Sequence, residues 1–297
     1  MHRGGTGRMP ASDEMMQAMM TPADLPIWAM LTPPSLDALL LGRGQTVPRA
    51  ITLASDLDSS SVADAPLLTT TRLMIQRAQA IDGLTLTATG ALSRADVRAI
   101  FDAMSWPGYD KVNALAMNKV LNEADVMPVE LTRLTAQTAK LLRQRDKRLL
   151  TSKVSGALAE PEAAPELFAR LFATIFWQTN LSYFDRVPFE AWPQNHIGIV
   201  LWCLSVAGEG WFLPEDLMRS CTVWEPALIE GHADFPAYAF ESRVLRPLSW
   251  FGLLEMRMIG DLDAPTWQRD RQYRKATLFD LALRFDVKVA RPPGPAH

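Results

Sequence analysis

The chain has 297 residues, a net charge of −3 and a hydrophobic content of 48%. This composition is typical of a soluble globular protein of about two domains, and it excludes a disordered chain. The longest apolar run, Ile197–Gly208, is too short to cross a bilayer, so no membrane contact is expected. The first ten residues do not resemble a signal peptide, and the sequence therefore predicts a cytoplasmic protein.

Residues 1–66 are rich in Met, Pro, Ser, Asp and Thr, and they contain one apolar island, Leu25–Leu41. Pro33 and Pro34 interrupt this island, and proline rarely continues a helix. The sequence therefore predicts a flexible N-terminal arm with one or two short docking helices, which could meet a protein partner. Residues 291–297 are predicted to be a disordered tail.

A first domain is predicted over residues 67–156, because helical patterns alternate there with short β-branched segments. The expected helices cover 68–81, 94–104, 112–122 and 129–144. Ser93 is the expected N-cap of the second helix, and Pro128 opens the fourth. Leu84–Gly90 and Lys147–Ser152 have the character of strands in a small ribbon.

A linker is expected over residues 157–165, followed by a second domain over 166–290. Helices are predicted at Glu166–Thr179, Ile197–Val206, Pro214–Ser220 and Tyr238–Phe251. Leu253–Met258 and Tyr273–Leu278 form the expected closing ribbon. The predicted fold class is mainly α, with two winged-helix-like domains, each a three-helix unit closed by a small β-ribbon.

Three segments carry a resemblance to a known family: Leu84–Gly90, the helix-to-ribbon block ending in Leu149-Leu150-Thr151, and Phe240–Leu254. Over about residues 67–283 the chain resembles uncharacterised bacterial proteins grouped with the plasmid-borne Ri open-reading-frame-three family. The chain has a loose arm where that family has a β-rich N-terminal domain. The chain also resembles winged-helix, or helix-turn-helix, proteins in general. This resemblance implies DNA binding, and it brings no catalytic residues.

The most basic segment of the chain ends the first domain. Between Leu131 and Lys153 seven Lys or Arg residues accompany one acid, Asp146. On a helix over 129–144, one polar row faces away from the core and could read base edges in a major groove, while the residues after the helix could bind phosphates. The predicted DNA-binding residues are Arg133, Gln137, Lys140, Gln144, Arg145, Lys147 and Arg148. A solvated polar face remains the alternative interpretation.

The following segment, residues 157–235, is acidic, with eleven Asp or Glu residues against three Arg. This asymmetry can direct double-stranded DNA to one surface, and the acidic lobe could instead meet a protein partner. Arg243 and Arg246 are interleaved with acids, so intramolecular ion pairs are expected there, including bidentate pairing with the acidic lobe. The two hypotheses are a winged-helix DNA-binding protein, such as a transcriptional regulator, and a protein–protein interaction module.

An enzyme of unknown class is the third hypothesis. The sequence contains no GxSxG, HExxH, P-loop or GxGxxG motif. His196 could form a dyad with Asp185 or Cys203, although a histidine that caps a helix is the more common case. Cys203 and Cys221 match no zinc or redox spacing and are expected to be buried thiols. No catalytic residue, metal or cofactor is predicted.

Overall fold

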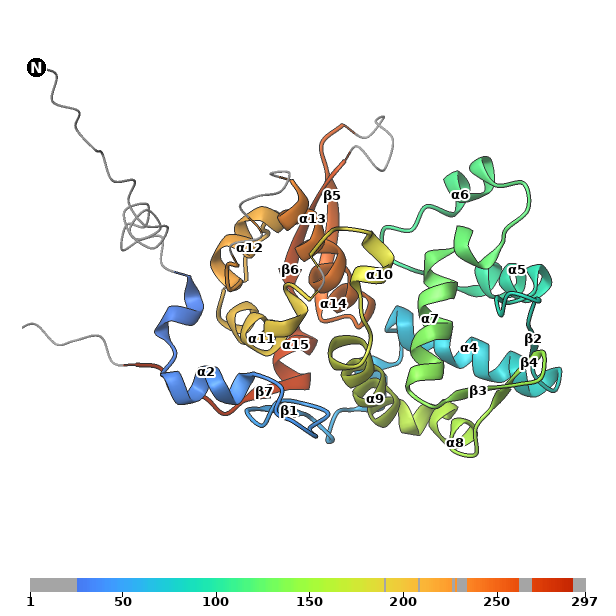
Figure 1. Ribbon diagram of the computed structural model, residues 1–297, viewed down its shortest axis with the longest axis horizontal. Coiled ribbons are helices and arrows are strands. Elements are labelled where there is room, and N and C mark those ends of the chain that lie inside the picture. The colour runs from blue at the N-terminus through green and yellow to red at the C-terminus, as the bar shows by residue number, and fades with distance from the viewer. Residues whose placement is uncertain are drawn as a thin grey trace, which may run out of the picture.

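A computed structural model describes residues 26–189, 191–207, 209–225, 228, 234–261 and 269–290. Over this part of the chain the protein is mainly helical, with three small antiparallel sheets. Residues 66–151, cyan to green in Figure 1, lie at one side, and the C-terminal half, yellow to red, lies beside them. The predicted tail, residues 291–297, and residues 1–25 of the predicted arm lie outside the described residues.

The first unit is a run of helices and short strands between residues 66 and 151. Its elements are α4 (Pro66–Ala80), β2 (Leu84–Thr85), α5 (Arg94–Ala103), α6 (Lys111–Met117), the short 3-10 helix η3 (Glu123–Asp125), α7 (Met127–Thr138), β3 (Leu142–Arg145) and β4 (Arg148–Thr151). Three of the four predicted helices correspond to α4, α5 and α6. The third ends at Met117, earlier than predicted.

Local sequence signals start the first helices. Pro66 occupies the first turn of α4, where its missing amide leaves no hydrogen bond unmade. The hydroxyl of Ser93 accepts a hydrogen bond from the amide of Asp96 at 3.2 Å, so Ser93 is the N-cap of α5 as predicted. Helix α5 then buries Val97 and Ile100 along one face, a spacing that gives an amphipathic helix.

Helix α7 ends at Thr138, so the predicted helix is wrong over its C-terminal part. Lys140 takes the left-handed backbone conformation with a φ of 59°, and the amide of Leu141 donates to the carbonyl of Ala136 at 2.8 Å. This arrangement is a C-terminal cap of the kind that usually employs glycine. Because the chain leaves the helix at this point, Gln144 lies on β3 and not on α7.

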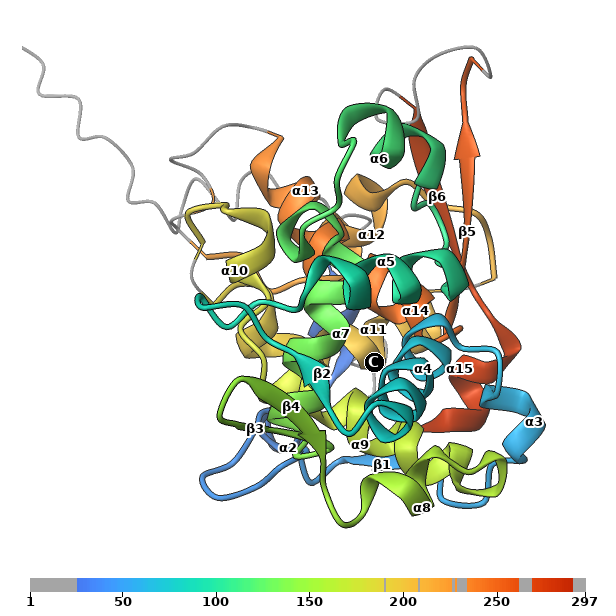
Figure 2. The same cartoon turned by 90° about the vertical axis from the view of Figure 1, so that its right-hand side faces the viewer.

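The three strands of the first unit form one antiparallel sheet in the order β2-β4-β3. Strand β3 pairs with β4 through a hairpin in which Arg145 lies opposite Arg148 and Gln144 lies opposite Leu149. Asp146, at the hairpin turn, has a φ of 54°, a conformation that aspartate tolerates better than most residues. Figure 2 shows this sheet beside α4, α5 and α7. The predicted ribbon segments thus supply the strands β2 and β4.

Helices connect the two units where a linker was predicted. They are α8 (Ser155–Ala159), η4 (Pro161–Ala163), α9 (Ala164–Trp177) and α10 (Ser182–Asp185). The predicted linker 157–165 is therefore largely helical. Helix α9 buries Phe168, Phe172 and Phe176, which recur at a spacing of four residues and so lie on one face.

The second unit, like the first, consists of helices followed by a two-stranded hairpin. Its elements are η5 (Gln194–His196), α11 (Ile197–Val206), α12 (Pro214–Cys221), α13 (Phe235–Phe240), the π-helical segment η7 (Glu241–Leu245), α14 (Arg246–Trp250), β5 (Leu254–Ile259) and β6 (Asp270–Lys275). Phe212, before α12, exchanges two backbone hydrogen bonds of 3.0 and 2.9 Å with Tyr273 of β6. It therefore occupies the place that β2 has in the first unit.

Two sequence predictions for the second unit need correction. The last predicted strand, Tyr273–Leu278, ends at Lys275, because Thr277 opens helix α15 (Thr277–Ala282). The predicted kink at Pro247 takes the form of η7, a π-helical turn directly before the proline-containing helix α14.

The described part of the predicted arm packs on the second unit. It contains η2 (Ile27–Met30), α2 (Pro33–Leu39), β1 (Ile51–Leu53) and α3 (Ser59–Val62), and β1 pairs with the C-terminal strand β7 (Leu283–Phe285). A Cβ atom on Gly198 of α11 would lie 2.0 Å from the carbonyl oxygen of Leu39, so α11 approaches the arm too closely for any larger residue there. The short helices agree with the prediction. Residues 26–66 were expected to be flexible, but they form packed elements and a strand paired with β7.

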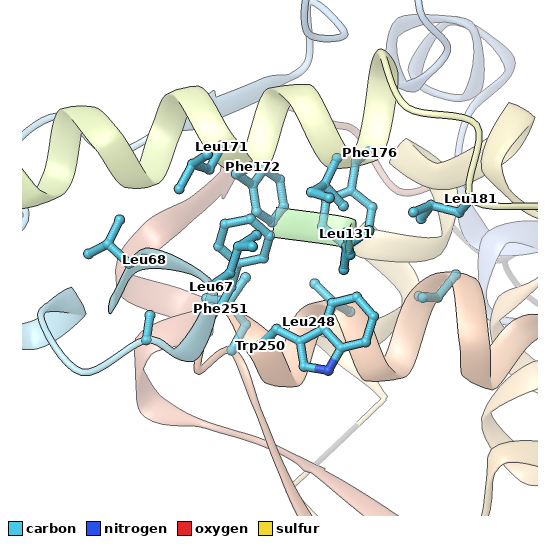
Figure 3. Packing of buried hydrophobic residues seen from close by; sticks show 14 of the residues in the cluster. Leu67, Leu68, Leu131, Leu171, Phe172, Phe176, Leu181, Leu248, Trp250 and Phe251 are labelled. Atoms are coloured by element: carbon cyan, nitrogen blue, oxygen red, sulfur yellow. The ribbon is translucent and has the colours of Figure 1, made fainter. Parts of the chain in front are cut away.

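One hydrophobic core joins the two units. Figure 3 shows Leu131 of α7 and Leu248 of α14 below the phenylalanines of α9. The ring of Phe172 lies 5.3 Å from that of Phe251, and Trp106 of the first unit lies 4.9 Å from Trp250 of the second. The two units are therefore joined through α9 and through the loop that follows α5.

Candidate nucleic-acid interface

Helix α7 does not present the predicted recognition row to solvent. The side chain of Arg133 is 12% exposed and forms an ion pair with the buried carboxylate of Glu123 on η3. Its Nη1 also donates to Oε1 of Gln137 at 2.6 Å. Two of the four residues in the predicted row are thus bonded within the protein, and their polar groups are not directed toward a ligand.

The other residues of α7 are also covered. Within this helix Thr138 alone is exposed, and the remaining positions are buried or half-buried. The helix that continues from α13 to α14 is equally enclosed, with Tyr238 its only exposed residue. Both helices are thus largely enclosed by the surrounding protein, whereas base readout requires a helix face that is open to the major groove.

The hairpin β3–β4 carries four exposed basic residues, Arg143, Arg145, Lys147 and Arg148. The pairing places Arg143 and Leu150 opposite each other, and Arg145 opposite Arg148. Residues opposite one another point to the same side of a sheet. The three guanidinium groups therefore share the outer face of the hairpin, whereas Leu142 and Leu149 on the other face are buried in the core.

Lysines extend this basic surface at both ends of the hairpin. Lys147 lies in the turn, and Lys140 and Lys153 flank the two strands, all exposed. We call the six cations the hairpin patch: Lys140, Arg143, Arg145, Lys147, Arg148 and Lys153. Asp146 lies 3.9 Å from Arg145 at an exposed site, where an ion pair neutralises little of the field.

Arg148 also connects the patch to the rest of the unit. Its Nη1 donates to the backbone carbonyls of Ile81, at 3.2 Å, and of Asp82. The carboxylate of Asp82 lies 3.6 Å away. In the described part of the chain, the remaining cations of the patch have no ion-pair partner apart from Asp146. Arg148 thus anchors the hairpin to the turn at Ile81 and Asp82, while the other cations of the patch stay accessible to an anion.

The structure brings four of the predicted residues, Lys140, Arg145, Lys147 and Arg148, together on or beside the hairpin, and Gln144 is exposed next to them on the opposite face of β3. Arg143 and Lys153 were not among the predicted residues and lie beside them. Recognition of the strand that begins at Leu142 would have found Arg143, because residues two positions apart in a strand share one face.

The second predicted basic cluster forms ion pairs, as expected. Arg243 is buried and binds Asp185 with two hydrogen bonds of 2.6 and 2.8 Å. Its remaining donors reach the backbone carbonyls of Phe189, Trp192 and Val187. Asp185 belongs to the acidic segment, so the predicted bidentate pairing of arginine with that segment is confirmed.

The residues considered for a catalytic dyad are not arranged as one. Asp185 is bound to Arg243, and His196, at the N-cap position of α11, lies 3.7 Å from Glu225. Burial lowers the pKa of His196, and proximity to Glu225 opposes this change. Burial raises the pKa of the Cys203 thiol far above its usual range and that of Cys221 to about 12. Both thiols therefore stay protonated and poorly nucleophilic at neutral pH.

The described residues contain no group of three or more His, Cys, Asp or Glu side chains that could hold a metal ion. None of the described helices has both the length and the apolar character needed to cross a bilayer.

Comparison with known proteins connects the first unit to a family without an assigned role. Residues 63–164 match the Y4jL N-terminal domain. The uncharacterized protein y4jL of Sinorhizobium fredii (strain NBRC 101917 / NGR234) is 32% identical over 141 residues, which is 46% of this chain and 63% of that protein. No solved structure matches the chain. The chain thus resembles an uncharacterised family over its first unit, and it spans less than two thirds of the relative's length.

Proposed function

We propose that the protein is a non-enzymatic, winged-helix-like DNA-binding protein that contacts the phosphate backbone with its β3–β4 hairpin. Apart from the inserted helix α6, the order helix, strand, helix, helix, strand, strand supports a winged-helix relationship for the first unit, with the hairpin as the wing. The second unit likewise ends in a hairpin, β5–β6. A role in transcriptional regulation, as in many proteins built from such units, is part of the proposal.

The observation that carries the proposal is the clustering of three guanidinium groups on one face of the hairpin. Like charges directly opposite in a sheet destabilise it. A polyanion would relieve this repulsion, and the release of counterions from DNA would drive binding. Because α7 is covered, the proposed binding is largely independent of base sequence.

The test is a salt titration of binding to two duplexes of unrelated sequence. We expect binding at about 50 mM salt that weakens steeply as salt rises, with a logarithmic slope of ~0.9 for each phosphate contact. The variant Arg143→Glu, Arg145→Glu should lose most of the affinity, and its slope should fall by about 2. The control Arg43→Glu, Lys119→Glu changes the net charge equally at exposed sites outside the hairpin and should bind as the wild type does.

Two outcomes would overturn the proposal. One is the absence of any shift of either duplex at low salt and micromolar protein. The other is an equal loss of affinity in the hairpin and control variants, which would mean that net charge alone governs binding.

A protein–protein interaction module is the second candidate function. It is favoured by the burial of α7 and α14 in the common core, where both helices serve packing. The inserted helix α6 exposes Val112 and Met117, which are 80% and 74% accessible, and apolar side chains of this kind are common where a partner docks. The interaction-module hypothesis would be supported if the wild-type protein fails to bind duplex DNA.

A further inference from the structure

A cavity of about 120 Å³ lies between the two units. The loop after α5 and the start of α7 form its walls on one side, and α14, β5 and β6 form them on the other. The rings of Trp106, Tyr109 and Trp250 line it together with the side chains of Arg246 and Arg271. Among the described residues, no acidic side chain lines this cavity. It therefore combines aromatic walls with two cations.

The charges around the cavity do not balance. Oε1 of Glu241, behind the lining residues, accepts hydrogen bonds from Tyr273 at 2.8 Å, Arg246 at 3.2 Å and Arg271 at 3.4 Å. One carboxylate thus forms ion pairs with two guanidinium groups. Burial, and then the charge of Glu241, raises the pKa of Tyr273 well above its usual range, so its phenol stays neutral. Among the described residues, one positive charge at the cavity wall is left without an acidic partner.

The two guanidinium groups keep hydrogen-bond donors for a ligand. Glu241 uses Nε of Arg246 and Nη1 of Arg271, and each guanidinium has five N–H donors. The side chains are 28% and 19% exposed, so they are partly shielded from water and still accessible. Guanidinium groups in this setting bind carboxylates through paired, charge-assisted hydrogen bonds.

We propose that this cavity binds a small monocarboxylate with a flat apolar body, with the carboxylate between Arg246 and Arg271 and the body against Trp106 and Trp250. The cavity is smaller than the apolar cavity of about 150 Å³ that accepts benzene, and it is partly open to solvent. It can therefore hold the carboxylate and one edge of a ring, while the rest of the ring lies at the mouth. The site is separate from the hairpin patch and does not depend on DNA binding. Because its walls come from both units, a bound ligand stabilises their association and raises the melting temperature.

The experiment uses benzoate as the probe and benzamide as its neutral isostere, with binding measured by calorimetry on the full chain. We expect the wild type to bind benzoate and not benzamide, with a higher melting temperature in benzoate alone. Arg271→Gln should weaken benzoate binding at least tenfold through loss of a charged hydrogen bond. Arg257→Gln is the matched control, because Arg257 lies on the same hairpin and stacks on Trp211 outside the cavity. It should leave benzoate binding unchanged.

Several outcomes would overturn the proposal. The first is the absence of any heat of binding at about 10 mM benzoate. The second is benzamide binding as tightly as benzoate, and the third is unchanged benzoate binding in Arg271→Gln. Inorganic phosphate that binds as tightly as benzoate would show that the apolar body contributes nothing and would reject the ligand class. The benzoate and benzamide comparison on wild-type protein decides the question even if a variant fails to fold.

Discussion

Both units end in a two-stranded hairpin, and the charged residues of the two hairpins are arranged in opposite ways. In the first unit, the hairpin β3–β4 presents Arg143 and Arg145 to solvent with little neutralisation. In the second, Arg274 of the hairpin β5–β6 pairs with Glu255, and Lys275 pairs with Asp280 at 2.9 Å. Similar hairpins thus carry exposed, largely unpaired cations in one unit and ion pairs in the other. The position of a hairpin is set by topology, but its availability to a ligand depends on which acids lie nearby.

Among the predictions, the largest effect on stability is expected for the buried ion pair between Arg243 and Asp185. Arg243→Met should lower the free energy of unfolding by about 3–5 kcal/mol, because the carboxylate of Asp185 would stay buried without its partner. The matched control is Arg219→Met on α12, whose pair with Glu215 is exposed and is worth about 0.3–0.5 kcal/mol. Urea denaturation of both variants measures the difference. A similar small loss in the two variants would show that the buried pair contributes little.

Arg133 tests whether α7 has a structural or a binding role. Arg133→Met leaves Glu123 buried and should cost about 2–3 kcal/mol of stability. Affinity for duplex DNA, measured well below the melting temperature, should stay as in the wild type, because this side chain faces the protein interior. A loss of DNA binding with normal stability would instead restore α7 as the recognition element.

The hairpin should show a conflict between stability and binding. Arg145→Thr removes the repulsion with Arg148 and adds a residue that favours strands, so we expect a gain of roughly 0.2–1 kcal/mol at low salt. DNA affinity should fall in the same variant. Thermal melts at low and high salt check the origin of the gain, which should shrink as salt screens the charges. A gain that does not depend on salt would point to strand propensity alone.

The smallest expected effect is a dependence of stability on pH through His196. Its pKa in the folded protein is lowered, so the unfolded chain takes up the proton first. The contribution of the neutral ring is complete above the unfolded pKa of about 6.5 and is lost as pH falls toward the lower folded value. His196→Gln should remove this part of the acid destabilisation, as measured by the difference in melting temperature between variant and wild type from neutral to mildly acidic pH. An identical pH profile in the two proteins would contradict the prediction.

Local signals in the sequence predicted much of the fold. The cap at Ser93, the proline at the start of α7 and the spacing of the phenylalanines in α9 act within a few residues. Such signals are set by helix geometry and by backbone hydrogen bonding, so they could be recognised without the tertiary structure. The end of α7 was missed because a lysine, Lys140, takes the left-handed position that glycine usually marks.

The candidate site was harder to predict, because exposure is a property of the whole molecule. The concentration of positive charge between residues 131 and 153 was evident in the sequence. The fold decided which of those charges are free, because Glu123 forms an ion pair with Arg133 and because α4 and α9 pack on α7. Likewise, β1 and β7 meet although they lie at opposite ends of the chain. The sequence by itself determined the order of elements and the location of the basic segment. Only the tertiary structure decided which cations face solvent, because ion pairing and burial depend on contacts between distant residues.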